Sequence, residues 1–161
     1  MPRLLETEIL LPGLRPEDVF SFFADARNLE KLTPPWLRFA VETPSPIDLR
    51  EGTLVDYRLR LHGIPFPWRS AITRWEPPAL FEDTQVRGPY RLWRHAHRFE
   101  ARDGGTLASD RVVYDMIGGA LIDLIVRRDL RRVFAFRART LPALLGLGPL
   151  PPAEVRFGRV P

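Results

Sequence analysis

The feature that most constrains the fold is a long β-hairpin expected over residues 93–114. Asp103-Gly104 is a typical two-residue turn, since a type I′ turn needs positive φ at both central positions. The strand before this turn alternates between two faces: Trp93, His95, His97, Phe99 and Ala101 on one, and Arg94, Arg98, Glu100 and Arg102 on the other. This alternation is typical of an antiparallel sheet with one face covered and the other in water.

The turns also predict which residues lie opposite one another. With Asp103-Gly104 as the loop, His97 falls opposite Asp110, His95 opposite Val112 and Trp93 opposite Tyr114. A second turn, placed at Gly63-Ile64, sets Leu59 opposite Trp68 and Tyr57 opposite Ser70. In both hairpins the apolar-rich faces coincide, as a consistent register requires.

The remaining elements follow from periodicity and from breakers. We expect a strand over 3–11, stopped by Pro12-Gly13, and two short helices over 16–24 and 26–32. From Leu37 onward the chain predicts six or seven consecutive antiparallel strands, counting the hairpins above. A long helix is expected over 120–141, ending or kinking near Pro142, and a Gly- and Pro-rich tail from Gly146 should pack weakly.

Composition limits the class of protein. The 161 residues are enough for one domain with its own core, and the chain has no cysteine, which excludes disulfides and thiolate metal sites and favours a cytoplasmic protein. No stretch reaches the roughly 20 apolar residues of a membrane span. The first residues, with Glu6 and Glu8, indicate a strand and not a signal peptide. We therefore expect a soluble α+β domain.

The net charge of +4 is concentrated on the expected C-terminal helix. Six arginines and two aspartates lie between Ala120 and Thr140, and the rest of the chain is balanced. A solvated helix face is the simplest interpretation; transient contact of Arg127, Arg128, Arg131 and Arg132 with an anionic membrane surface is an alternative. No nucleic-acid-binding motif accompanies the arginines, so we expect no nucleic-acid partner.

A string of residues makes the chain similar to a known superfamily. It comprises Phe20 and Phe23, then Leu32-Thr33-Pro34-Pro35, then Phe81-x-Asp83-x-Gln85-x-x-Gly88-Pro89-Tyr90-x-x-Trp93-x-His95-x-His97-x-Phe99, and finally Gly105-Thr106, Asp110 and Tyr114. With the order of elements, it resembles small bacterial members of the START-like (SRPBCC, polyketide cyclase-like) superfamily. The resemblance implies a helix-grip fold over residues 1–145, with 146–161 as a tail, and a cavity for hydrophobic ligands between sheet and long helix. It does not imply one activity, because a fold hosts many functions.

The registers bring an unusual number of polar groups to the concave face under the helix. The predicted ligand-binding residues are Tyr57, Trp68, Asp83, Arg91, Trp93, His95, His97, Asp110, Tyr114, Leu121 and Ile125, and Gln85 faces the same way. One interpretation is a polar patch that orients a mostly apolar ligand. The other is a self-satisfied structural network, with Asp110 accepting from His97, and Asp83 pairing with Arg91 or the indole of Trp93.

Two chemical alternatives use the same face. His97 held by Asp110, with Tyr57 nearby, has the form of an acid–base site for a cyclase- or dehydratase-like reaction, and no serine or cysteine nucleophile lies in a recognisable motif. His95, His97 and Asp110 could also make a facial metal-binding set. No EXXH or CXXC motif supports that set, and His62 is assigned to a turn and to the opposite face, so we expect neither metal nor cofactor.

The sequence thus predicts, first, a protein that binds or carries a small hydrophobic or aromatic molecule. Entry would be controlled by movement of the long helix or of residues 61–66. An enzyme of the cyclase type, or an interaction module that uses the basic helix, are the alternatives. We expect a monomer or a weak dimer, since nothing specifies pairing through an exposed edge strand.

Overall fold

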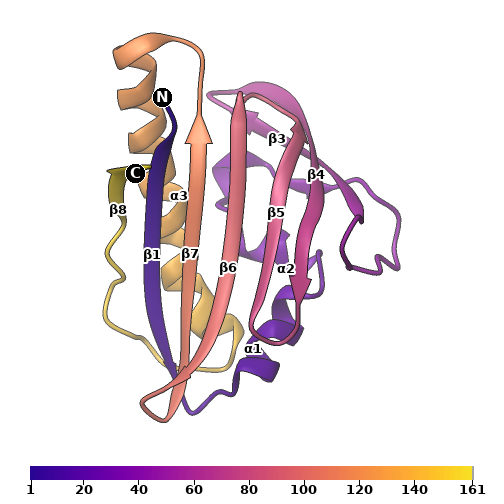
Figure 1. The fold of residues 1–161 in the computed structure, drawn as a ribbon, viewed down its shortest axis with the longest axis vertical. Coiled ribbons are helices and arrows are strands. Elements are labelled where there is room, and N and C mark those ends of the chain that lie inside the picture. The colour runs from indigo at the N-terminus through magenta and orange to yellow at the C-terminus, as the bar shows by residue number, and fades with distance from the viewer. Residues whose placement is uncertain (161) are drawn as a thin grey trace.

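The computed structural model describes residues 1–160, in which a curved antiparallel sheet packs against one long helix (Figure 1). The strands are β1 (Arg3–Pro12), β2 (Ala40–Val41), β3 (Leu54–Leu61), β4 (Ile64–Glu76), β5 (Leu80–Arg87), β6 (Leu92–Arg102), β7 (Gly105–Asp115) and β8 (Arg156–Arg159). The helices are α1 (Pro16–Phe23), α2 (Asn28–Leu32), the 3₁₀ turn η1 (Pro35–Leu37) and α3 (Gly119–Leu144).

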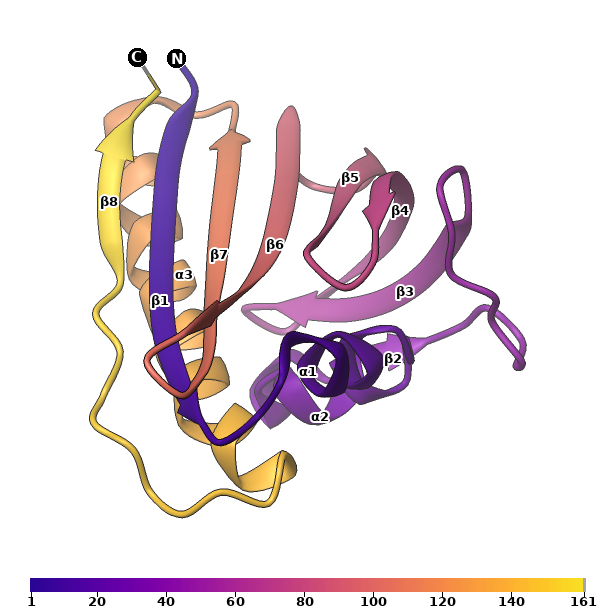
Figure 2. The same cartoon turned by 60° about the horizontal axis from the view of Figure 1, so that its bottom comes forward.

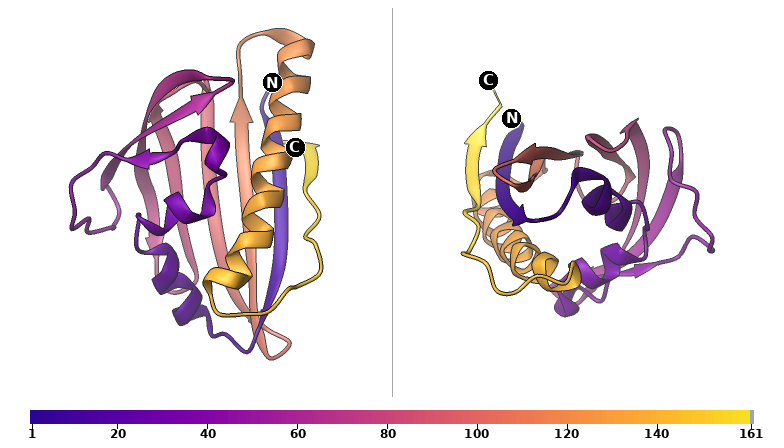
Figure 3. Two further views of the ribbon diagram at one scale, coloured as in Figure 1. Left: turned by 180° about the vertical axis from the view of Figure 1, so that it is seen from behind. Right: turned by 90° about the horizontal axis from the view of Figure 1, so that it is seen from below.

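The eight strands form one sheet in the order β2-β3-β4-β5-β6-β7-β1-β8. Figure 2 shows how strongly the sheet bends, with β3 running across the end of the molecule that α1 and α2 cover. From behind, α3 runs along the concave side of the sheet, and from below the sheet and helices surround a common interior (Figure 3). This is the helix-grip fold that the sequence predicted. Strands β2 to β7 are the six consecutive antiparallel strands expected after the short helices, and β8 is a further strand from the tail.

The β6–β7 hairpin has the predicted register. His97 lies opposite Asp110 and Trp93 opposite Tyr114, with Arg102 and Gly105 closing the ladder. Asp103 and Gly104 both have positive φ, at 48° and 72°, as the turn type requires.

The predicted register of the β3–β4 hairpin is wrong by two residues. Tyr57 lies opposite Trp68 and Leu61 opposite Ile64, because the turn is formed by His62 and Gly63, both with positive φ. A shift of two residues preserves the strand alternation, so each side chain still faces the predicted side of the sheet.

The C-terminal tail was expected to pack weakly, and this is wrong for its last residues. Arg156–Arg159 form β8, which pairs with β1 and covers an edge of the sheet beside the N-terminal strand. Phe157 packs against the core cluster under α3, with the guanidinium groups of Arg127 and Arg131 over its ring at 5.0 and 5.2 Å. Pro142 does not end the long helix, which continues to Leu144.

The core has two parts that leave space between them. One gathers around Phe20, Phe81 and Phe99 beneath α1, and the other around Trp93, Tyr114 and Phe134 beneath α3. No helix within residues 1–160 has the length and apolar character needed to cross a membrane.

Candidate functional site

A cavity of about 550 Å³ lies between the sheet, the two short helices and α3. This volume is within the range of about 300–1,000 Å³ typical of small-molecule sites. Seven of its lining residues are exposed and mark where it reaches solvent: Asp25, Trp36, Arg60, His62, Gly63, Ile125 and Arg132. Most of the wall is apolar, including Phe22, Leu29, Leu32, Phe39, Leu59, Ile72, Met116, Ile122, Val126, Leu130 and Val133.

The structure places most of the predicted ligand-binding residues on this wall. These are Tyr57 from β3, Trp68 from β4, Asp83 from β5, Trp93, His95 and His97 from β6, and Ile125 from α3. His62, which was assigned to the opposite face, also lines the cavity, and its Nε2 lies 2.7 Å from Asp129 Oδ2 on α3.

Four predicted residues lie elsewhere. Arg91 precedes the first paired residue of β6, so the strand alternation does not apply to it, and it reaches outward to Asp115 at 3.6 Å. Leu121 is 70% exposed because it is out of phase with the buried stripe of α3; Ile122 lines the cavity in its place. Tyr114 is fully buried beside Trp93, and Asp110 lies behind the two histidines.

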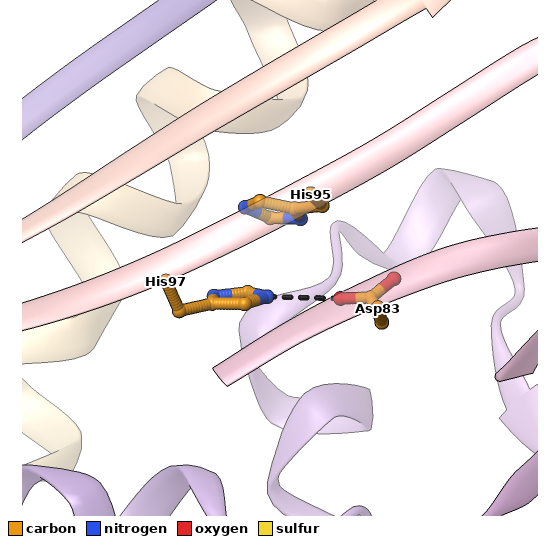
Figure 4. A group of neighbouring side chains, drawn as sticks. All are labelled: Asp83, His95 and His97. Atoms are coloured by element: carbon orange, nitrogen blue, oxygen red, sulfur yellow. Dashed lines mark hydrogen bonds and ion pairs between the residues drawn. The ribbon is translucent and has the colours of Figure 1, made fainter. Parts of the chain in front are cut away.

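Asp83, His95, His97 and Asp110 form a buried polar network at one end of the cavity. Asp83 Oδ2 lies 3.0 Å from His97 Nε2 (Figure 4). Asp110 Oδ1 lies 2.8 Å from His95 Nε2 and 3.2 Å from His97 Nδ1. The predicted Asp110–His97 pairing is therefore present, but the predicted partner of Asp83 is wrong, because His97 takes the place expected for Arg91 or Trp93.

Arg137 completes this network, and the sequence analysis did not predict it. Its side chain is buried, with Nη2 3.4 Å from Asp110 Oδ1 and 3.3 Å from His97 Nδ1, and its guanidinium lies over the ring of Phe23 at 5.3 Å. The helix phase carried the signal, since Arg137 follows Phe134 by three residues and precedes Leu141 by four, both buried.

The network sets different protonation states for its two histidines. Burial lowers the pKa of His95 to about 4, despite its hydrogen bond to Asp110, so this imidazole is neutral. Burial also opposes the charged form of His97, but hydrogen bonds to Asp110 and Asp83 outweigh it and raise its pKa. Burial likewise favours the neutral form of Asp110, yet Arg137 and the two histidines hold its pKa well below the usual range.

These states define what the polar end offers to a ligand. Neutral His95 donates through Nε2 to Asp110, which leaves Nδ1 as an acceptor without a hydrogen-bond partner within residues 1–160. The Tyr57 hydroxyl likewise has no partner in that range, and burial raises its pKa, so it stays protonated and can donate. Both residues line the cavity. The chamber thus has an apolar body and one polar end with a free donor and a free acceptor.

Comparison with known proteins shows which family the chain belongs to. Residues 13–137 match the family model described as "Polyketide cyclase / dehydrase and lipid transport". The chain belongs to this family. No curated protein matches this family member.

Solved structures agree on the fold of this family member. Protein Ms6760 from Mycobacterium smegmatis has a TM-score of 0.66 at 21% identity, over 89% of this chain and 90% of that chain. Protein CV1439 from Chromobacterium violaceum has a TM-score of 0.68 at 15% identity, over 90% of this chain and 98% of that chain. Ara h 8.0201 has a TM-score of 0.59 at 16% identity, over 85% of this chain and 95% of that chain. At these identities the likeness concerns the fold alone, while the family suggests that its members bind hydrophobic ligands.

Proposed function

We propose that the protein binds and carries a small, largely apolar molecule with at least one hydrogen-bonding group. The observation that carries this proposal is the cavity of about 550 Å³, apolar over most of its wall and polar at one end. A well-packed domain of this size leaves few voids larger than a water molecule, so a chamber of this volume needs a functional explanation.

The polar end limits what the ligand can be. The ligand would accept a hydrogen bond from the Tyr57 hydroxyl and donate one to His95 Nδ1, as an aromatic or alicyclic alcohol can. Trp68 and Trp93, whose rings pack edge to face with centroids 5.4 Å apart, would contact its flat apolar body. Residues 61–66 contain the β3–β4 turn, whose His62 and Gly63 line the cavity at its opening. Movement of this segment would let the ligand enter.

The test combines ligand identification with a blocked cavity. Native and denaturing mass spectrometry of the purified protein would detect a released molecule, and titration with a fluorescent apolar probe would measure occupancy. Val133→Trp places an indole in the cavity from α3, whereas Val86→Trp adds the same group at an exposed position on β5 outside it. We expect probe affinity to fall at least about tenfold, or about 1.4 kcal/mol, in the first variant only. Equal affinity in both variants would refute binding in this cavity.

A second candidate is acid–base chemistry on the bound molecule, favoured by the free Nδ1 of His95. A neutral imidazole held at Nε2 by a carboxylate has the form of an oriented general base. This differs from the predicted role of His97, both of whose nitrogens already contact carboxylates. Once a substrate is known, full turnover by His95→Gln would exclude this role.

Contact with an anionic membrane stays a prediction, and the structure changes which residues would make it. Arg127 and Arg131 stack on Phe157, and Arg132 on Trp36, which leaves Arg128 the most available of the four. Leu121 and Leu124 are exposed on the same helix. Co-sedimentation with anionic vesicles should weaken in a Leu121→Ser, Leu124→Ser variant; no co-sedimentation of the wild type at physiological salt would refute the idea.

A further inference from the structure

Three side chains of the types that bind metal ions meet at the polar end of the cavity. The ligand atoms of Asp83, His95 and His97 all lie within 4.8 Å of one another, and both histidines are buried (Figure 4). Metal–ligand bonds of about 2.1 Å put neighbouring ligand atoms about 3.0–3.4 Å apart in octahedral or tetrahedral sites. His97 Nε2 and Asp83 Oδ2 lie 3.0 Å apart, within that range. To bind an ion, the Nε2 proton must leave, these two side chains must turn toward a shared point, and His95 must approach it.

Asp110 orients both imidazoles for this role. Its Oδ1 contacts Nε2 of His95 and Nδ1 of His97, so one nitrogen of each ring is held from behind. The opposite nitrogens, Nδ1 of His95 and Nε2 of His97, are then the ones available to the cavity and to Asp83. Histidines that bind metals almost always donate their other N–H to a carboxylate, carbonyl or water, which fixes the tautomer and ring orientation. Here one carboxylate does this for two histidines.

The charge balance allows a cation in exchange for a proton. Asp83 and Asp110 bring two carboxylates into a buried environment where Arg137 supplies one positive charge and His97, which contacts both carboxylates, holds the proton that supplies the other. A divalent ion that displaces the proton on His97 Nε2 takes over this compensation, so the buried carboxylates remain paired. The sequence analysis expected no metal because no EXXH or CXXC motif accompanies the two histidines and His62 was assigned to the opposite face, and it named Asp110 as the possible third ligand. In the structure, β5 brings Asp83 to the cavity side of the pair, opposite His95 in the β5–β6 ladder.

We propose that Asp83, His95 and His97 bind one divalent transition-metal ion at the polar end of the cavity. Two imidazoles and one carboxylate suit Zn²⁺, Co²⁺ or Fe²⁺, and such a set leaves coordination positions open. These positions face the cavity, where a ligand oxygen such as an enolate, phenolate or carboxylate would complete the coordination. The ion site depends on the fold and not on the proposed carrier function, because its protein ligands are in place whether or not an organic molecule binds.

The test uses tag-free protein that has been treated with chelator and dialysed. Titration with Co²⁺, followed by its visible spectrum and by calorimetry, should show one equivalent bound. Asp83→Asn and His95→Gln should abolish the spectrum, and Asp110→Asn should weaken binding by about 10–100-fold. His62→Gln is the control, since it removes a histidine at the cavity opening that pairs with Asp129 and should leave the affinity unchanged.

The outcomes separate the two proposals. Absence of a Co²⁺ spectrum in the folded wild type would overturn the metal site. Binding that survives Asp83→Asn or His95→Gln, or that is lost in folded His62→Gln, would overturn it as well. Circular dichroism on each variant identifies any that fail to fold. The Co²⁺ titration of the wild type tests the site even if a variant does not fold. Probe titration on the same samples tests the apolar cavity independently, so the metal site can fail while the carrier function survives, and the reverse.

Discussion

Replacing Arg137 by methionine tests whether the polar network stabilises the folded protein. The change removes the guanidinium 3.4 Å from Asp110 while keeping an unbranched side chain to pack between Phe23 and Phe134. At an effective dielectric constant of about 20, unit charges at this separation attract by about 5 kcal/mol. Breaking a buried pair from one side typically costs about 3–5 kcal/mol. Two imidazoles still contact Asp110, so we expect a loss near the lower end, about 3 kcal/mol.

The assay is equilibrium unfolding in urea of the wild type, Arg137→Met and Arg139→Met. Arg139 lies two residues further along the same helix and is exposed, so its replacement should change the free energy of unfolding by no more than about 0.5 kcal/mol. A double-mutant cycle with Asp110→Asn isolates the pair, and the cost of Arg137→Met should shrink in that background. If Arg137→Met unfolds within about 1 kcal/mol of Arg139→Met, with equal m-values, the network contributes no stability and our reasoning is wrong.

Three further changes test other parts of the fold by thermal or urea unfolding. Tyr114→Phe removes a buried hydroxyl that has no hydrogen-bond partner within residues 1–160, so stability should stay equal or rise by up to about 1 kcal/mol, and a clear loss would reveal a missed partner. Gly105→Ala should cost on the order of 2 kcal/mol, because its Cβ would collide with the Leu11 carbonyl and lie 2.9 Å from Pro12 Cα, whereas Gly148→Ala meets open space and should be near neutral. Phe157→Ala should cost about 1–2 kcal/mol by freeing β8 from α3, and an unchanged midpoint would mean that β8 adds nothing.

The fold was predictable wherever a local signal fixed a long-range pairing. The turn at Asp103-Gly104 allows only one register, and that register placed His97 opposite Asp110. At the β3–β4 turn, Gly63 can be either the first or the second residue of a two-residue turn. The sequence analysis placed it first, whereas it is second, so the predicted partner of each β3 residue is two residues from the actual one. Because strand side chains alternate with period two, the error left Tyr57 on the cavity face.

The site was harder to predict because it depends on which charged residue is buried. A run of arginines on one helix predicts a solvated face, and that description holds for Arg128 and Arg139 but fails for Arg137. Burial of Arg137 becomes favourable only because Asp110 lies beneath the same turn of α3, and that proximity comes from packing of the helix on the sheet. The cavity volume is likewise set by side chains from many elements, none of which determines it alone.

The arrangement of the polar groups bears on whether the network serves the fold or a ligand. A buried ionic cluster is weak evidence for stability in itself, because apolar residues of similar volume often do as well. Here the cluster is asymmetric: Asp110 and Arg137 lie on the protein side of the histidines, whereas His95 Nδ1, Tyr57 and Asp83 face the cavity. A structural network would satisfy its members among themselves. Acceptors and donors left free toward a chamber of about 550 Å³ instead fit a surface whose remaining partner is the bound molecule, or an ion held between it and the protein.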